Sequence, residues 1–131
     1  MFEFMSRNHY LNMLPTGVRE PLRKMFDRGY AKQKRVVTPA ADGIADMEAD
    51  VIVLGTGIDL TGFTPKFVGQ EVQIICTDST ADATVTCGSG VTFDGTNDVA
   101  TFGDDNDAII VTSISLTRWA VVSNVGAVAF S

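Results

Sequence analysis

Residues 108–131 read AIIVTSISLTRWAVVSNVGAVAFS, and this stretch decides the fold class of the chain. Aliphatic residues alternate with threonine and serine along its first half, which is the period of a β-strand with one buried face. Asn124-Val125-Gly126 has the composition of a hairpin turn. The stretch therefore predicts three successive strands, at 108–116, 119–123 and 127–130.

The same pattern extends back to residue 51. Short runs rich in Val, Ile, Thr and Phe are separated by Gly, Asp and Asn, and no segment has a helical period. Asp94-Gly95 and Gly103-Asp104 have the composition of hairpin turns. Further strands are predicted at 51–54, 71–77, 83–87, 91–93 and 99–102. The expected fold is mainly β: a small antiparallel β-sandwich or barrel-like body, or a trimeric intertwined β body.

Charge divides the chain into two parts. The first 35 residues contain eight Lys or Arg and three Asp or Glu, whereas from Val36 onward only Lys66 and Arg118 accompany thirteen acids. The segment 36–50 contains Pro39 and Gly43, which interrupt any regular pattern. We therefore predict a basic N-terminal arm at 1–35, a linker at 36–50 and an acidic β domain at 51–131.

The arm carries an apolar stripe. Large apolar residues recur at steps of three and four, and basic residues flank them, which predicts an amphipathic helix at about 17–33. Such a helix is suited to docking on another protein. The candidate partner-binding residues are Val18, Leu22, Arg23, Lys24, Met25, Phe26 and Tyr30.

Other partners fit the arm less well. Nucleic acid is disfavoured because the acidic domain would repel the phosphates that the arm attracts. Membrane binding is disfavoured because the stripe is short and Asp27 interrupts its basic flank. The first residues lack the apolar run of a secretion signal, so synthesis in the cytoplasm is expected.

The sequence does not favour an enzyme, a cofactor or a metal site. The β domain has no histidine, and Cys76 and Cys87 fall in phase with apolar residues, as buried free thiols would; a cross-strand disulfide between them is the alternative. The glycines in residues 51–62 (VIVLGTGIDLTG) lack the following helix that a dinucleotide site requires. Five aspartates cluster in two loops, but their spacing is not that of a calcium loop, and turn residues are the simpler interpretation. They are Asp94, Asp98, Asp104, Asp105 and Asp107.

Residues 91–131 resemble the closing strands of bacteriophage virion proteins, including capsid decoration or cement proteins and short head- or tail-fibre β-modules. The resemblance is carried by Val91–Gly95, Ala108–Val111 and Arg118–Asn124, in which a Gly/Asp-punctuated module ends with a Trp-containing strand and a final strand of small residues. It implies a non-enzymatic homotrimer located in the virion and assembled in the host cytoplasm. Its partner would be the major capsid protein or another virion protein.

These observations favour a structural protein that attaches to a phage capsid through its arm and decorates or stabilises the shell. The alternative is a receptor- or glycan-binding β-module of a tail appendage, which would use exposed residues such as Asp104, Asn106 and Trp119. A third possibility, an internal virion protein bound to nucleic acid, depends on the arm alone. Trp119 falls within a predicted strand, where we expect it in the core.

Overall fold

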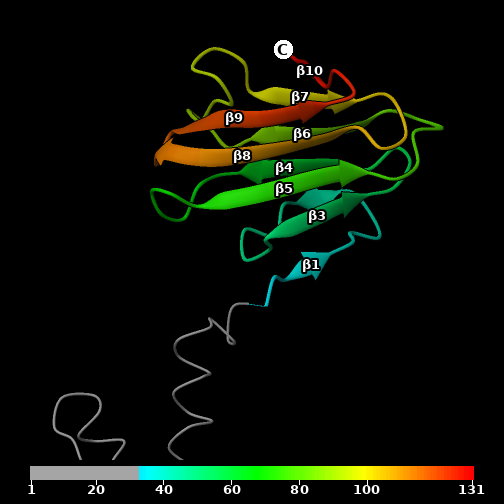
Figure 1. Ribbon diagram of the computed structural model, residues 1–131, viewed down its shortest axis with the longest axis horizontal. Coiled ribbons are helices and arrows are strands. Elements are labelled where there is room, and N and C mark those ends of the chain that lie inside the picture. Colours follow the sequence, from blue (N-terminus) through cyan, green and yellow to red (C-terminus); the bar gives the residue numbers. More distant parts are fainter. Residues whose placement is uncertain (1–32) are drawn as a thin grey trace, which may run out of the picture. The chain divides into compact units, whose positions relative to one another are not determined.

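The structure, a computed structural model, describes residues 33–131, and this part of the chain forms two mixed five-stranded sheets without a helix (Figure 1). Sheet A has the order β1 (Val36–Val37), β3 (Val51–Leu54), β5 (Glu71–Cys76), β8 (Ala108–Ser115), β9 (Arg118–Val125). Sheet B has the order β10 (Ala129–Phe130), β7 (Val99–Phe102), β6 (Ala83–Cys87), β4 (Asp59–Phe63), β2 (Gly43–Ile44). The prediction of a mainly β fold is confirmed. The predicted helix at about 17–33, all but its last residue, and all seven candidate partner-binding residues lie outside the described residues.

The first six strands wind as three successive coils, each with one strand in sheet A followed by one in sheet B. As a result β1, β3 and β5 pair in parallel in sheet A, and β2, β4 and β6 pair in parallel in sheet B. The remaining pairs, β5–β8, β8–β9, β6–β7 and β7–β10, are antiparallel. The prediction of an antiparallel sandwich is therefore wrong for the first half of the domain. The reason is that a chain which crosses to the other sheet after every strand comes back to the same sheet running in the same direction, so neighbouring strands of that sheet are parallel.

The segment 36–50, read from sequence as a linker, supplies the first coil. It contributes β1 and β2, and Ala45 and Ala49 are buried in the core. These residues therefore belong to the β domain. Each strand is only two residues long, so neither has enough residues to show the alternation by which strands are recognised in sequence.

Two predicted hairpin turns connect the sheets instead. The turn at Gly103-Asp104 leads from β7 in sheet B to β8 in sheet A, and the turn at 124–126 leads back from β9 to β10. The tight hairpin is β8–β9, which turns at Leu116-Thr117. The predicted strand at 91–93 is reduced to an isolated bridge between Thr92 and Arg118.

The core lies between the two sheets, because along most strands every second side chain is buried. Trp119 on β9 has no exposed surface, and its ring stacks on Phe63 of β4 with centroids 4.6 Å apart. Phe63 in turn stacks on Phe93, which lies in the loop between β6 and β7. The predicted core position of Trp119 is confirmed, and the aromatic stack joins the two sheets.

Both cysteines are free and buried, as their apolar phase predicted. Burial, assisted by Asp98 and Asp94, raises the pKa of Cys87 to about 12. At pH 8 its thiolate population, and hence its alkylation rate, should be about a thousandfold below that of an ordinary thiol. Timed iodoacetamide labelling with peptide mapping, native and in denaturant, measures this protection; fast native labelling of Cys87 would contradict the burial. Because the unfolded thiol ionises first, the domain should also lose stability as the pH rises from about 9 towards 12.

Candidate functional site

Three parallel strands begin at the same end of the domain. β1, β3 and β5 run in the same direction, and Glu71 at the start of β5 pairs with Thr112 near the end of β8. The β8–β9 hairpin therefore projects from the end at which Lys34 leads into β1. The chain segment that carries the predicted arm is thus covalently joined to the domain at this end.

Large apolar side chains are exposed at the same end. Phe67 and Val68 lie in the loop between β4 and β5 and are 58% and 62% exposed, and Ile114 and Leu116 at the β8–β9 hairpin are 52% and 55% exposed. We call these four residues the apolar tip. They make up half of the domain's eight exposed large hydrophobic residues. An exposed cluster of this kind is typical of a surface that contacts another molecule.

Ser113 joins the two parts of the apolar tip, the loop of Phe67 and Val68 and the β8–β9 hairpin. Its hydroxyl donates to the Phe67 carbonyl oxygen at 2.7 Å and accepts from the backbone amide of Gln70 at 3.0 Å. Its backbone completes the connection, since its amide donates to Gln70 O and its carbonyl accepts from the Gly69 amide. Ser113 itself is 1% exposed. Hydrogen bonds of a buried residue therefore connect the β4–β5 loop to the β8–β9 hairpin.

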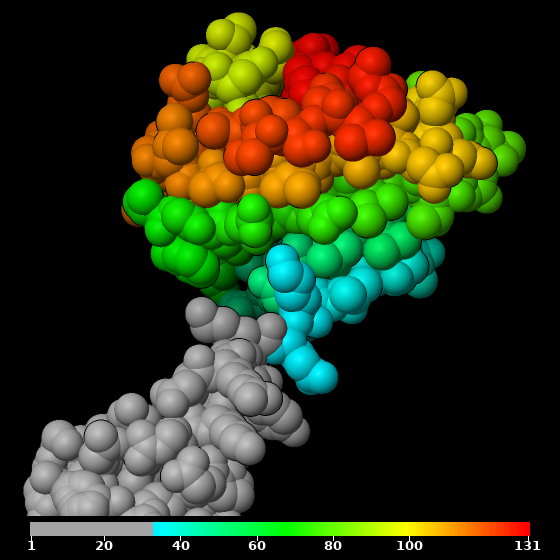
Figure 2. Space-filling view, in the orientation of Figure 1, coloured from blue at the N-terminus to red at the C-terminus, as the bar shows by residue number. Residues whose placement is uncertain are grey.

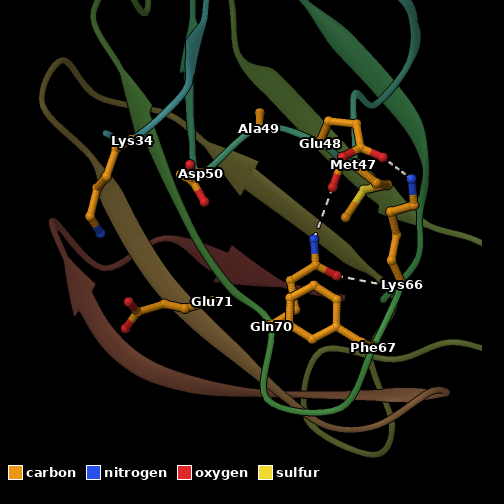
Figure 3. Close-up of a pocket in the computed structure, with 9 residues that line it drawn as sticks. All are labelled: Lys34, Met47, Glu48, Ala49, Asp50, Lys66, Phe67, Gln70 and Glu71. Carbon is orange, nitrogen blue, oxygen red and sulfur yellow. Dashed lines mark hydrogen bonds and ion pairs between the residues drawn. The ribbon is translucent and has the colours of Figure 1, made fainter. Parts of the chain in front are cut away.

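A pocket of about 300 Å3 adjoins the tip (Figure 3). It shares Phe67 with the tip, and the Gln70 side chain spans its wall by donating to Met47 O at 2.9 Å and accepting from the Lys66 amide at 2.7 Å. The Lys66 ammonium pairs with the Glu48 carboxylate, and both residues line the pocket. The lining residues are Lys34, Met47, Glu48, Ala49, Asp50, Lys66, Phe67, Gln70 and Glu71.

The described residues that line the pocket include acids and lysines, two of which already form an ion pair, and no cysteine or serine is among them. Among residues 33–131 no three His, Cys, Asp or Glu side chains lie together as a metal site would require. The same residues include no helix long and apolar enough to cross a membrane.

The aspartate loops have a structural use. Asp94 accepts from the Thr96 and Asn97 amides, and these contacts, Asn97 first, lower the pKa of its carboxyl group. The buried Asp107 carboxylate accepts from the amides of Gly103 and Asp104 at 3.1 and 3.0 Å. Both side chains close turns through backbone N–H groups.

Sequence reasoning missed the apolar tip. Ile114 and Leu116 were placed in a predicted strand, where they read as core residues, and Phe67 and Val68 fall in a loop without a motif. The signal available was the run Ile114-Ser115-Leu116-Thr117, whose aliphatic residues fall out of phase with the buried Ile109 and Val111. Trp119, weighed earlier as a surface for a glycan, is fully buried and cannot serve as one in the folded domain.

No protein-family model matches the chain, and no curated protein matches it.

Proposed function

We propose that this protein is a non-enzymatic structural component of a bacteriophage virion, which attaches to the capsid through its N-terminal arm and decorates or stabilises the shell. The observation that carries the proposal is the position of the apolar tip, at the end where the arm-bearing segment enters the β domain. The arm and the tip can then contact one surface together. The partner is the major capsid protein or another virion protein.

Apolar burial provides the attachment energy in this mechanism. A large side chain that becomes fully buried contributes about 1.5–3 kcal/mol before ordering costs. The four residues of the tip and the stripe of the arm, Leu22 and Phe26 above all, provide several such anchors. The basic residues of the arm steer and orient the approach. Three chains in one homotrimer would strengthen attachment further, because binding of the first raises the effective concentration of the others.

The second candidate is a receptor- or glycan-binding module of a tail appendage. The loop of Asp104, Asp105 and Asn106 favours it, because all three residues are exposed at the start of β8, the end of the domain opposite the apolar tip. A loop there would remain free when the tip is docked. Binding of the isolated protein to host cells, lost on replacing Asp104 and Asn106 with Ala, would support this candidate.

Sedimentation of particles with added protein tests the attachment. Particles assembled without this chain are mixed with purified variants, pelleted and quantified. The amount of pelleted protein should fall at least tenfold for the arm variant Leu22→Ser/Phe26→Ser and for the tip variant Phe67→Ser/Leu116→Ser, since each removes two apolar anchors. The control is Ile44→Ser, which changes a side chain that is 81% exposed at the edge of sheet B and should bind as wild type.

The charges distinguish protein docking from nucleic-acid binding. Arg23→Gln/Lys24→Gln should slow attachment but leave the bound amount at saturation nearly unchanged. If nucleic acid is the partner, the same variant should instead lose most of its binding and show a shallower dependence on salt. Wild-type binding by the Ser variants of both arm and tip would contradict the proposed attachment.

A further inference from the structure

Two carboxylates of the pocket beside the apolar tip have no cation partner within the part of the chain that the structure describes. Asp50 directly precedes β3 and Glu71 begins β5, and both line the pocket. The two ion pairs of the described residues use Asp46 and Glu48 instead. One Asp50 carboxylate oxygen accepts from the Arg35 amide at 2.8 Å. Asp50 and Glu71 are therefore the groups with which a cationic ligand would pair.

Parallel strand pairing places these two acids side by side. Val51 on β3 and Gln73 on β5 are register partners, so Asp50 and Glu71 stand at the starts of adjacent strands about 4.8 Å apart. Lys34 leads into β1, on the other side of β3. Figure 2 shows the start of the described chain, in cyan, beside the green segments of β3 and β5. Residues distant in sequence thus form one charged side of the pocket.

The other side of the pocket is largely apolar. Met47 packs against the hydrophobic core, and the ring of Phe67 is more than half exposed. Figure 3 shows Met47 on the opposite side of the Gln70 side chain from Asp50 and Glu71. Gln70 is buried and held by its two side-chain hydrogen bonds, so it fixes the shape of the pocket between the two sides. A ligand that fills the pocket therefore needs an apolar stem and a charged head.

Charge favours a cationic head. The nine lining residues include three acids and two lysines, and Lys66 is already paired with Glu48. Two carboxylates then stand against the single ammonium of Lys34. The described domain as a whole contains thirteen Asp or Glu and four Lys or Arg, so its field attracts cations and repels anions.

We propose that this pocket binds an arginine side chain of a partner protein. The methylene stem of the arginine lies on Met47 and Phe67, and its guanidinium group bridges the carboxylates of Asp50 and Glu71. Arginine suits the site better than lysine, because the planar guanidinium has five N–H donors that can reach carboxylates on two strands at once. The guanidinium is also more weakly hydrated than an ammonium, which suits a partly enclosed pocket.

The inference deepens the proposed function, on which it rests for the identity of the partner. Phe67 belongs both to the pocket and to the apolar tip, so a surface that docks on the tip can place an arginine in the pocket at the same time. Arginine is also one of the residues that most often anchor protein interfaces. The virion protein that contacts the tip should therefore present an arginine beside its apolar patch.

Titration of the full chain with N-acetyl-arginine amide, followed by nuclear magnetic resonance, tests the site directly. The backbone amide signals of Asp50, Phe67 and Glu71 should shift saturably, with a Kd of about 1–10 mM, because two partly exposed ion pairs contribute little affinity. N-acetyl-citrulline amide has nearly the same shape without the charge, and it should give no saturable shift.

Variants locate the binding at the two acids. Asp50→Asn/Glu71→Gln should weaken binding of the arginine probe about tenfold. The asparagine keeps an oxygen for the Arg35 amide, so the fold should be retained and an unchanged melting temperature checks this. The matched control is Asp82→Asn/Asp104→Asn, which removes the same charge from two exposed acids that precede β6 and β8 at the opposite end of the domain. This control should bind as wild type.

A third variant should act in the opposite direction. Lys34→Met removes the cation beside the two acids and should strengthen binding about two- to threefold. The proposal is overturned if the citrulline probe binds as well as the arginine probe, or if Asp50→Asn/Glu71→Gln binds as wild type. Equal binding of N-acetyl-lysine amide would overturn the choice of arginine.

Particle sedimentation separates this proposal from the proposed function. Particles that bind the wild type and lose the tip variant, with no response to the arginine probe, would count against the pocket alone. Saturable probe binding by a chain that does not attach to particles would count against the proposed function alone.

Discussion

Trp119→Ala is expected to destabilise the β domain by about 3–5 kcal/mol, the usual cost of removing a fully buried aromatic side chain. The indole ring has no exposed surface and stacks on Phe63 at 4.6 Å, so its removal leaves a cavity between the two sheets. A domain of this size has about 5–15 kcal/mol of stability in total. Urea denaturation followed by far-ultraviolet circular dichroism should therefore show a large shift of the midpoint.

Trp119→Phe separates ring packing from hydrogen bonding. The indole Nε1–H of Trp119 is buried and has no acceptor among residues 33–131. Phenylalanine keeps much of the stacking and removes this unsatisfied donor, so its cost should be well below that of alanine. If Trp119→Phe proves as damaging as Trp119→Ala, the indole N–H has a partner beyond the described residues. Wild-type stability of Trp119→Ala would contradict the core position.

Gly126→Ala is the second change with a large expected effect. Gly126 has a φ of +87°, and a Cβ at this position would overlap the carboxylate of Asp107. That carboxylate is buried and holds the Gly103 and Asp104 amides. Alanine must therefore strain the backbone and displace the carboxylate, for an expected loss of about 3 kcal/mol or more.

Two other glycines provide matched controls for Gly126→Ala. Gly69 has a φ of +91° with no atom close to its missing Cβ, so Gly69→Ala should show the backbone strain alone, about 1 kcal/mol. Gly43 has open space around it and no unusual φ, so Gly43→Ala should be close to neutral. Thermal melts of the three variants should follow this order. Equal losses of melting temperature for Gly126→Ala and Gly69→Ala would show that displacing the Asp107 carboxylate does not destabilise the domain.

Sequence patterns predicted strands well where alternation was long enough. The predicted strands at 51–54, 83–87 and 99–102 match β3, β6 and β7 in their bounds, and 71–77 and 108–116 match β5 and β8 to within one residue. Strand β4 was missed because its sequence, DLTGF, lies in a glycine-rich stretch. Its Gly62, with a φ of +71°, falls where the register with β6 shifts. An interrupted strand of this kind shows no regular period of two.

The pairing of the strands could not be predicted from the same patterns. Alternation shows which residues face the core but not which sheet a strand belongs to. Turns with hairpin composition were therefore predicted to connect strands that pair with each other. Gly103-Asp104 instead connects strands in different sheets. The apolar tip was hidden for a related reason, because Phe67 and Ile114 are 47 positions apart and only tertiary structure places their loops together through Ser113.

The coil topology has a consequence for how the chain folds during synthesis. The first three coils are made from residues 36–87, but their core is closed by Trp119, which reaches Phe63 from a strand near the C-terminal end. Until β8 leaves the ribosome, one edge of β5 lacks its antiparallel partner, and until β9 follows, Phe63 lacks the Trp119 ring. Contacts so distant in sequence make folding slow. The nascent domain thus exposes apolar surface for most of its translation, and a chaperone that shields that surface would raise the yield of native protein.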